Sequence, residues 1–187
     1  MDWFTSDLHF GHDKKFLYEP RGFGSIKEHD DAVLRNINLC VGSDDTLYIL
    51  GDLMLNDNDH GLDYLSKLNG HKKIIIGNHD TDNRIKLYKE LDNVEILGYS
   101  FLIKSRNYNF LISHYPTICG NKDGDKALKS RVINLFGHTH AKDTFYNDNP
   151  LMYNVSLDAH SNYPISTESI IKSIINHINM KNALKTF

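Results

Sequence analysis

Short apolar runs that stop abruptly at a glycine are the feature that most constrains the fold of this chain. Thr46–Leu50 stops at Gly51-Asp52, and Lys72–Ile76 stops at Gly77-Asn78-His79-Asp80. Runs of this length that are rich in strand-forming residues are typical of buried strands that end in polar loops. Leucines and isoleucines at helical spacing fill residues 62–68 and 85–91. The alternation of strands and helices predicts an α/β layer architecture.

The remaining segments extend this pattern. Further strands are predicted at Asp2–Ser6, Glu95–Ile103, Asn109–Ser113, Val132–Phe136 and Leu151–Val155. A hairpin turn is predicted at Ser105–Tyr108, an irregular loop at His12–Lys27, and a helix over Glu28–Val41. A last helix is predicted after a cap at Ser166 or Thr167, with a frayed tail from Met180 onward.

Length and composition limit the class of protein. A chain of 187 residues with 40% hydrophobic residues suits one domain, which we expect to span residues 1–187. Its 21 basic and 24 acidic residues give a net charge of −3, so we expect no stable binding of duplex nucleic acid. Cys40 and Cys119 form no disulfide framework, and no apolar run is long enough for a membrane span or a leader. These features predict a cytoplasmic protein without membrane association.

Polar residues of the kind that bind metals follow the predicted strands. They are Asp7 and His9, Asp52, Asn78 and His79, His114, and His138 and His140. Ligands of open α/β sheets bind beyond the carboxyl ends of the strands, so these residues can converge although the sequence separates them. Residues two apart on an extended stretch point to the same side, so Asp7 and His9 can share one ion.

The types of these residues indicate the type of ion. Carboxylate and imidazole ligands without thiolate favour Mn²⁺, Fe²⁺ or Zn²⁺ and argue against a structural zinc site built on cysteines. Each short motif alone is an ordinary turn or a solvated loop. Together, in this order and at these strand ends, they favour a site for two metal ions.

The sequence resembles the calcineurin-like metallophosphoesterases, whose pattern is DxH, GD, GNH[DE], a single H, and GHxH. Asp7-Leu8-His9, Gly51-Asp52, Gly77–Asp80, His114 and Gly137–His140 match every block. The resemblance runs from Ser6 to about Ser166, because Asn154–Asp158 and Pro164–Ser166 are similar to the closing segment of small bacterial and phage members. It implies a four-layer αββα sandwich, in which helices flank two mixed sheets.

The resemblance also implies a role for each residue. Asp7, His9 and His140 would hold one metal, Asn78, His114 and His138 would hold the other, and Asp52 would bridge both. His79 would face the phosphate and protonate the leaving oxygen or stabilise the phosphoryl charge, and Asp80 would position neighbouring groups. Manganese is the leading expectation for the two divalent ions, with iron, zinc, nickel and magnesium as alternatives.

Substrate contacts are predicted from Asn78, His12 and Arg21. His12 follows His9 in the same loop and can reach the mouth of the site, although a solvated loop histidine is an equal alternative. Arg21 can bind a phosphate through its guanidinium group, whereas a surface arginine is the default expectation. No chemistry is assigned to His29, His60, His71 or His177, and no ligation to Asp158 or His160. Cys119 is expected in a pocket wall, and specificity is expected to lie in the loops His12–Lys27 and Cys119–Ser130.

The predicted function is hydrolysis of a small phosphate mono- or diester, with nucleotides and cyclic nucleotides among the candidates, by a hydroxide that bridges the two metals. One alternative is a binding scaffold of the same fold without catalysis, which would lack the histidine at position 79. A second alternative is a nuclease, but the short, mildly acidic chain weighs against it. The substrate, the native metal and the oligomeric state are left open by the sequence.

Overall fold

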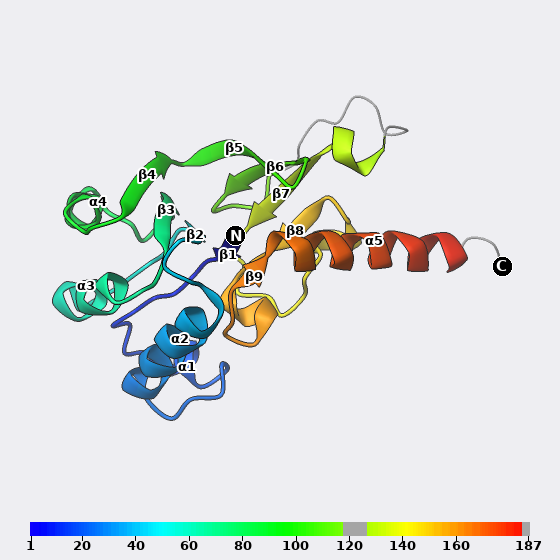
Figure 1. Cartoon of the computed structure of the whole chain (residues 1–187). Helices are drawn as coiled ribbons and strands as arrows, with labels where there is room; N and C mark the ends of the chain where they lie inside the picture. Colours follow the sequence, from blue (N-terminus) through cyan, green and yellow to red (C-terminus); the bar gives the residue numbers. More distant parts are fainter. Residues whose placement is uncertain (118–126, 185–187) are drawn as a thin grey trace.

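The computed structural model describes residues 1–117 and 127–184 (Figure 1). The elements of the first half are β1 (Asp2–Thr5), α1 (Lys15–Tyr18), α2 (Ile26–Cys40), β2 (Thr46–Leu50), α3 (Asn58–Ser66), β3 (His71–Ile75), α4 (Asp82–Lys89) and β4 (Val94–Gly98). Those of the second half are β5 (Ser100–Ser105), β6 (Tyr108–Ser113), η1 (Leu128–Ser130), β7 (Val132–Phe136), η2 (Tyr146–Asp148), β8 (Met152–Asn154), η3 (Leu157–His160), β9 (Ile165–Ser166) and α5 (Thr167–Leu184).

These elements form two mixed sheets flanked by helices. The first sheet has the order β4-β3-β2-β1-β9, in which β9 is antiparallel to β1 and the other pairs are parallel. The second has the order β5-β6-β7-β8, in which β5 is antiparallel to β6 and the other pairs are parallel. Helices α2, α3 and α4 pack on the first sheet, and α5 leaves β9 and runs along the second (Figure 1). The predicted fold class is confirmed.

The first sheet is buried on both faces. In β2, Leu47 and Ile49 point toward the helices, whereas Tyr48 and Leu50 point toward the second sheet. Phe4 of β1 stacks on Tyr48 with ring centroids 5.0 Å apart. Burial of both faces explains why β2 is apolar without interruption from Leu47 to Leu50 instead of alternating with polar residues.

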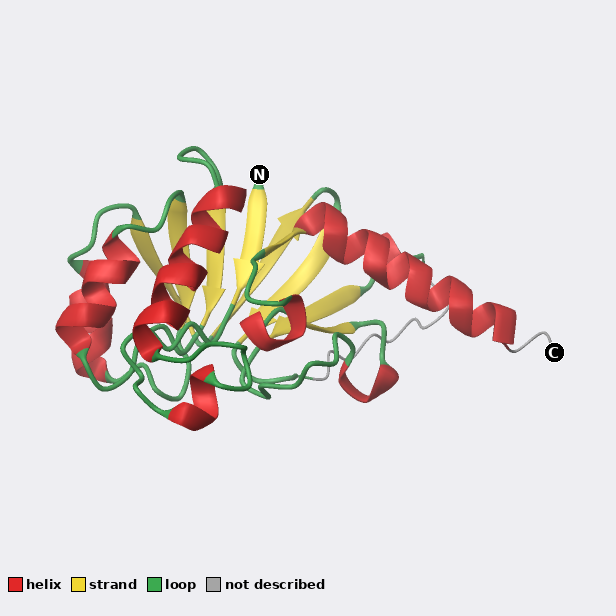
Figure 2. Cartoon of the chain, turned by 90° about the horizontal axis from the view of Figure 1, so that it is seen from below, coloured by secondary structure: helices red, strands yellow, loops and turns green. Residues whose placement is uncertain are grey.

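Strands of both sheets end at one edge of the molecule. Because β1, β2 and β3 are parallel, as are β6 and β7, their carboxyl ends lead into loops that gather on one side of the sandwich (Figure 2). The predicted ligands lie in these loops. The fold therefore brings together residues that are far apart in the sequence.

The predicted strand Glu95–Ile103 is wrong as a single element. The chain divides it between β4 of the first sheet and β5 of the second. The break falls at Gly98, whose φ of +100° lies in a region that side chains with a Cβ avoid. Both halves have the composition of a strand, so the pattern alone did not reveal the change of sheet.

Other boundaries shift by a few residues. The loop His12–Lys27 contains the short helix α1, and α2 begins at Ile26, where the Ser25 side chain caps the Glu28 amide at 3.2 Å. Helix α5 continues to Leu184 and does not fray at Met180. The predicted hairpin is confirmed, because Ser105 pairs with Tyr108 across a two-residue turn.

The helices of residues 1–117 and 127–184 include none that is both long enough and apolar enough to cross a membrane.

Candidate metal centre

All the predicted ligands lie in loops that follow strands of the two sheets. Asp7 and His9 follow β1, Asp52 follows β2, Asn78 follows β3, His114 follows β6, and His138 and His140 follow β7. Their side chains form two neighbouring groups that share Asp52.

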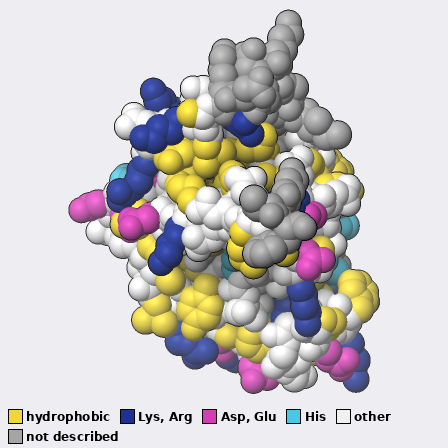
Figure 3. Space-filling view, turned by 90° about the vertical axis from the view of Figure 1, so that its right-hand side faces the viewer, with side chains coloured by type: hydrophobic (Ala, Val, Ile, Leu, Met, Phe, Trp, Pro, Cys, Tyr) yellow, Lys and Arg dark blue, Asp and Glu magenta, His cyan; other side chains and the backbone are white. Residues whose placement is uncertain are grey.

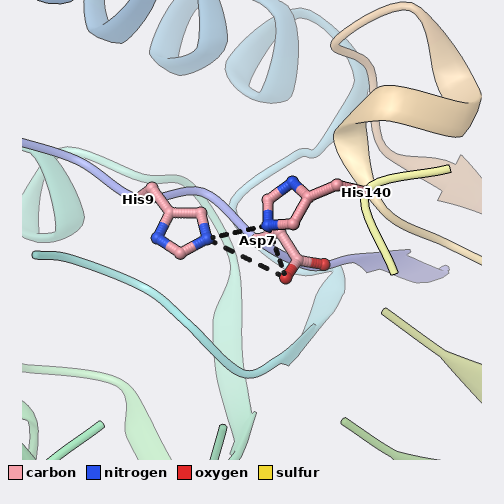
Figure 4. Close-up of side chains that lie close together, drawn as sticks. All are labelled: Asp7, His9 and His140. Atoms are coloured by element: carbon pink, nitrogen blue, oxygen red, sulfur yellow. Dashed lines mark hydrogen bonds and ion pairs between the residues drawn. The ribbon is translucent and has the colours of Figure 1, made fainter. Parts of the chain in front are cut away.

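The first group consists of Asp7, His9 and His140 (Figure 4). The Nε2 atoms of His9 and His140 are 3.3 Å apart. Asp7 Oδ1 lies 3.8 Å from His140 Nε2 and 4.0 Å from His9 Nε2. A tetrahedral ion bound at about 2.1 Å holds its ligand atoms about 3.4 Å apart, so these three atoms are spaced to hold one divalent ion.

The second group consists of Asn78, His114 and His138. Asn78 Oδ1 lies 2.9 Å from His114 Nε2 and 2.9 Å from His138 Nδ1. The amide oxygen therefore faces two imidazole nitrogens, as expected if all three residues hold one ion.

Asp52 lies between the two groups. Its Oδ2 atom is 3.8 Å from His9 Nε2 and 3.5 Å from His114 Nε2, whereas its Oδ1 atom accepts a hydrogen bond from the His79 amide at 2.9 Å. Asp7, Asp52 and His114 also form a group whose potential ligand atoms all lie within 4.8 Å of one another. One carboxylate oxygen of Asp52 can thus contact ions on both sides.

Two imidazoles are oriented by partners outside the groups. His114 Nδ1 lies 2.8 Å from the Leu50 carbonyl, and His140 Nδ1 lies 2.9 Å from Asp158 Oδ2. An Nδ1–H that donates to these acceptors leaves the Nε2 lone pair directed at the centre. The unprotonated nitrogen and oxygen atoms of each group then face one another at short distance and repel one another. A divalent cation bound between them would relieve this repulsion. The donor set therefore fits the metal ions that the resemblance implies.

Burial and mutual interaction shift the pKa values of the group. Burial by itself would raise the pKa of Asp52, but the hydrogen bond and charge of His114 lower it to about 2. Burial would likewise lower the pKa of His114, but Asp52 and Asp7 raise it above its usual value. Burial would also lower the pKa of His140, but Asp158 and Asp7 raise it above its usual value. Burial raises the pKa of Asp7 and holds that of His9 well below its usual value.

Most of the predicted ligands have an unusual backbone conformation. The following residues adopt positive φ: Asp7 (59°), His9 (51°), Asp52 (56°), His138 (66°) and His140 (49°). Residues other than glycine adopt this conformation rarely, and such residues cluster at functional sites where the surroundings enforce it. The loops therefore hold the ligand side chains at a cost in backbone energy.

Glycines in the motifs allow the loops to approach one another. A Cβ atom at Gly77 would overlap the Asp52 carboxylate, and one at Gly137 would overlap Ser6 Oγ and the Asp7 carboxylate. The missing side chain at Gly137 also lets the His138 amide donate to Asp7 Oδ2 at 3.0 Å.

Asp80 fixes the loops after β2 and β3. Its carboxylate accepts hydrogen bonds from the amides of Asp52 and Gly77, both at 2.8 Å, and of Leu53 at 3.2 Å. The Tyr88 hydroxyl donates to it at 2.9 Å. These contacts match the positioning role that was expected for Asp80.

His79 lies at the rim of the centre. Its Nε2 atom is 4.0 Å from Asp52 Oδ2, and its side chain is 43% exposed. His79 lines a pocket of about 620 Å³ together with His9, His12 and His140. The positions of His79 and His12 agree with the predicted contacts to substrate, which stay predictions.

Arg21 is placed differently from the prediction. Its guanidinium donates to both carboxylate oxygens of Asp158, at 3.0 and 2.7 Å, and to the Asp7 carbonyl at 2.9 Å, and its side chain is 1% exposed. Nη1 lies 2.9 Å from His29 Nε2. This burial argues against a contact between Arg21 and a substrate phosphate. The arginine instead positions the loop of Asp7 and, through Asp158, the ring of His140.

Asp158 contacts the candidate centre, which the sequence did not predict. It was expected not to bind metal, and it belongs to neither group of candidate ligands. Its carboxylate instead contacts His140 Nδ1, the ring nitrogen that points away from the centre. Its place in the closing segment of the family pattern was the only signal. The predicted pocket residue Cys119 lies outside the residues that the structure describes.

Comparisons with known proteins identify relatives that match most of the chain. No model of a known protein family matches the sequence. The Gene 66 protein of Mycobacterium phage D29 is 31% identical over 84% of this chain and 87% of its own length. The Gene 66 protein of Mycobacterium phage L5 is 29% identical over 74% of this chain and 77% of its own length.

A solved structure of similar length shares the fold of this chain. A protein of unknown function from Aquifex aeolicus has a TM-score of 0.68 and 26% identity, over 92% of this chain and 98% of that one. A phosphoesterase from E. coli has a TM-score of 0.49 and 16% identity, over 83% of this chain and 77% of that one, values too low to indicate a shared activity. The identity and coverage of the phage D29 relative decide the assignment: this chain belongs to the family of the mycobacteriophage Gene 66 protein.

Proposed function

We propose that this protein is a metal-dependent phosphoesterase that hydrolyses a small phosphate mono- or diester at a centre of two divalent ions. The observation that carries the proposal is the position of Asp52, whose Oδ2 atom lies within 4 Å of a ligand nitrogen in each group. The match of every motif block to the metallophosphoesterase pattern supports it independently.

The two groups of side chains would each hold one ion. When bound, the ions supply Lewis-acid polarisation of the phosphoryl oxygens and lower the pKa of water at the centre to near neutrality. No nucleophilic side chain is then required.

The protein's own residues would position the ester and handle a proton. His79 is exposed at the rim, and its imidazole Nε2 would donate a proton to the leaving oxygen or a hydrogen bond to the phosphoryl group. His9 and His140 line the same pocket. Asp158 and Arg21 keep the His140 ring in place while the ester binds.

The test begins with the full chain stripped of metal by a chelator and reloaded separately with Mn²⁺, Fe²⁺, Zn²⁺, Ni²⁺ or Mg²⁺. Hydrolysis of p-nitrophenyl phosphate and of bis-p-nitrophenyl phosphate is then measured, with the Asp52→Asn variant as the control for contaminating activity. We expect hydrolysis of at least one ester to depend on added metal, with Mn²⁺ the most effective. Folded protein that binds metal but hydrolyses neither compound, nor nucleotides or cyclic nucleotides, would favour a scaffold without catalysis.

A further inference from the structure

The pocket beside the candidate centre has an apolar wall. This apolar wall consists of Phe16, Leu17, Pro20 and Leu55, and the histidines of the centre line the same pocket. A volume of about 620 Å³ lies in the range of pockets that enclose a small organic molecule. The pocket is therefore much larger than a phosphate group requires.

Phe16 is the unusual member of this wall. It belongs to the short helix α1, and its side chain is 73% exposed, although Leu17 beside it is buried. Its ring meets the His12 ring edge to face, with centroids 5.6 Å apart, and the His12 ring lies 5.6 Å from that of His9. The wall thus continues directly from the candidate ligand His9 to an exposed aromatic face.

The described residues that line the pocket offer no unpaired lysine, arginine or carboxylate to bind a second charged group of a substrate. Among the residues that the structure describes, those lining the pocket include no lysine or arginine. Asp158, the one carboxylate among the described residues that line the pocket, is already bound by the guanidinium of Arg21. On the face of the molecule seen in Figure 3, basic and acidic side chains are both present and spread among apolar and neutral ones. The wall therefore offers apolar contact and no counter-ion.

We propose that the alcohol part of the substrate carries a flat aromatic ring, which packs on Phe16 and Leu55 while the phosphate lies at the histidines. This inference rests on the proposed function, because it places the phosphate at the candidate metal centre. Stacking of a ring on an aromatic side chain is strong enough to decide between substrates that differ in that ring. Esters with a single aromatic group, including nucleoside monophosphates and cyclic nucleotides, form the substrate class.

Phenylphosphonate and methylphosphonate test this proposal. They differ only in the ring, and neither contains an ester that can be hydrolysed. Binding of each to the Mn²⁺-loaded full chain is measured by isothermal titration calorimetry, at a pH where both are dianions. We expect phenylphosphonate to bind about tenfold more tightly than methylphosphonate.

Two variants locate the ring. Phe16→Ala and Leu55→Ala should each lower the preference for phenylphosphonate at least threefold, whereas Phe101→Ala, which removes a half-exposed aromatic ring on β5, should leave the preference unchanged. Equal affinities for the two phosphonates in the parent, or a preference that survives in both pocket variants, would overturn the proposal.

Failure of the aromatic subsite can be distinguished from failure of the proposed phosphoesterase activity. Hydrolysis of esters together with equal affinities for the phosphonates would overturn only the aromatic subsite. A preference for phenylphosphonate that depends on Phe16, in a protein that hydrolyses no ester, would leave the subsite intact and remove the phosphoesterase activity.

Discussion

At the scale of single residues, Asp52 connects the two groups of candidate ligands. Its side chain is almost fully buried, and His114 keeps its pKa at about 2, so the carboxylate is charged across the physiological range. A buried negative charge needs positive partners. His114, whose pKa is raised by Asp52 and Asp7, provides one such partner, and two divalent ions would do so more strongly.

Replacement of Asp52 by alanine is expected to lower metal content more than replacement of His9. Asp52→Ala removes a ligand atom that faces both groups, whereas His9→Ala removes one from the first group only. Elemental analysis after saturation with Mn²⁺ should find both ions reduced in Asp52→Ala, and about one ion retained in His9→Ala. Retention of one full ion and substantial activity in Asp52→Ala would contradict the bridging role.

His79→Ala is expected to keep both metals and the fold but to lose turnover. His79 is exposed at the rim, and a general acid at such a position contributes about a hundredfold to ten-thousandfold in rate. The loss should be large for a nucleoside leaving group and much smaller for p-nitrophenolate, which departs without protonation. Equal losses for both would indicate stabilisation of the phosphoryl oxygens instead. An unchanged rate for every ester would show that His79 has no catalytic part.

Asp158→Asn should weaken metal binding although Asp158 is not a predicted ligand. The carboxylate accepts from His140 Nδ1 at 2.9 Å and pairs with the buried Arg21, and loss of such a partner weakens metal affinity roughly 10- to 100-fold. Metal titration monitored by calorimetry checks this, with Asp63→Asn on the exposed surface of α3 as the matched control. Affinities that agree within twofold for the parent and both variants would rule the positioning role out.

At the scale of elements, the loops after the parallel strands are packed so closely that glycine is required. Gly137 lets the loop after β7 lie against the loop after β1, and Gly77 does the same between the loops after β3 and β2. The glycines of the motifs are thus explained by contact between loops, and five of the candidate ligands in these loops adopt positive φ.

Gly137→Ala is expected to destabilise the fold and to impair the first group of ligands. The added Cβ would push against Ser6 and the Asp7 carboxylate, and overpacking of this kind costs about 1–3 kcal/mol. Thermal unfolding and Mn²⁺ binding measure the two effects. Gly42→Ala is the matched control, because the nearest atom to its Cβ would lie at an ordinary 3.6 Å. Equal melting temperatures and metal contents for the two variants would disprove the crowding argument.

At the scale of the whole molecule, the candidate centre couples stability to metal and pH. In the metal-free protein the pKa values of His114 and His140 are raised, so their protonated forms contribute stability below the unfolded pKa of about 6.5, and this contribution is lost as pH rises through the folded pKa. Metal binding requires the same rings without that proton. Protons therefore compete with metal at and below neutral pH.

The increase in melting temperature on addition of Mn²⁺ should consequently grow from pH 6 to pH 8. Stabilisation by a ligand follows its concentration relative to Kd, and Kd improves as the histidines lose their protons. Differential scanning calorimetry with and without Mn²⁺ measures the increase. In Asp158→Asn, which lacks the carboxylate that raises the pKa of His140, the growth with pH should be smaller. An increase that is the same at both pH values would contradict the coupling.

Local sequence determined the strand ends, the hairpin and the set of candidate ligands. Residues 46–50 and 132–136 form strands with the predicted bounds, because short apolar runs that end at glycine specify both the strand and its end. The turn at Arg106-Asn107 was predictable because its residues alone set the geometry, with φ of 46° and 66°. The candidate ligands could be singled out in the sequence because each follows a predicted strand closely.

Tertiary structure decided what depends on distant partners. The division of the predicted strand 95–103 between two sheets follows from the packing of the sheets, since both halves have the same strand-forming composition. The inward turn of Arg21 depends on Asp158, which lies 137 residues away in the chain. An arginine in a loop is exposed by default, and only a buried carboxylate placed by the folded chain offsets the cost of removing its charge from water.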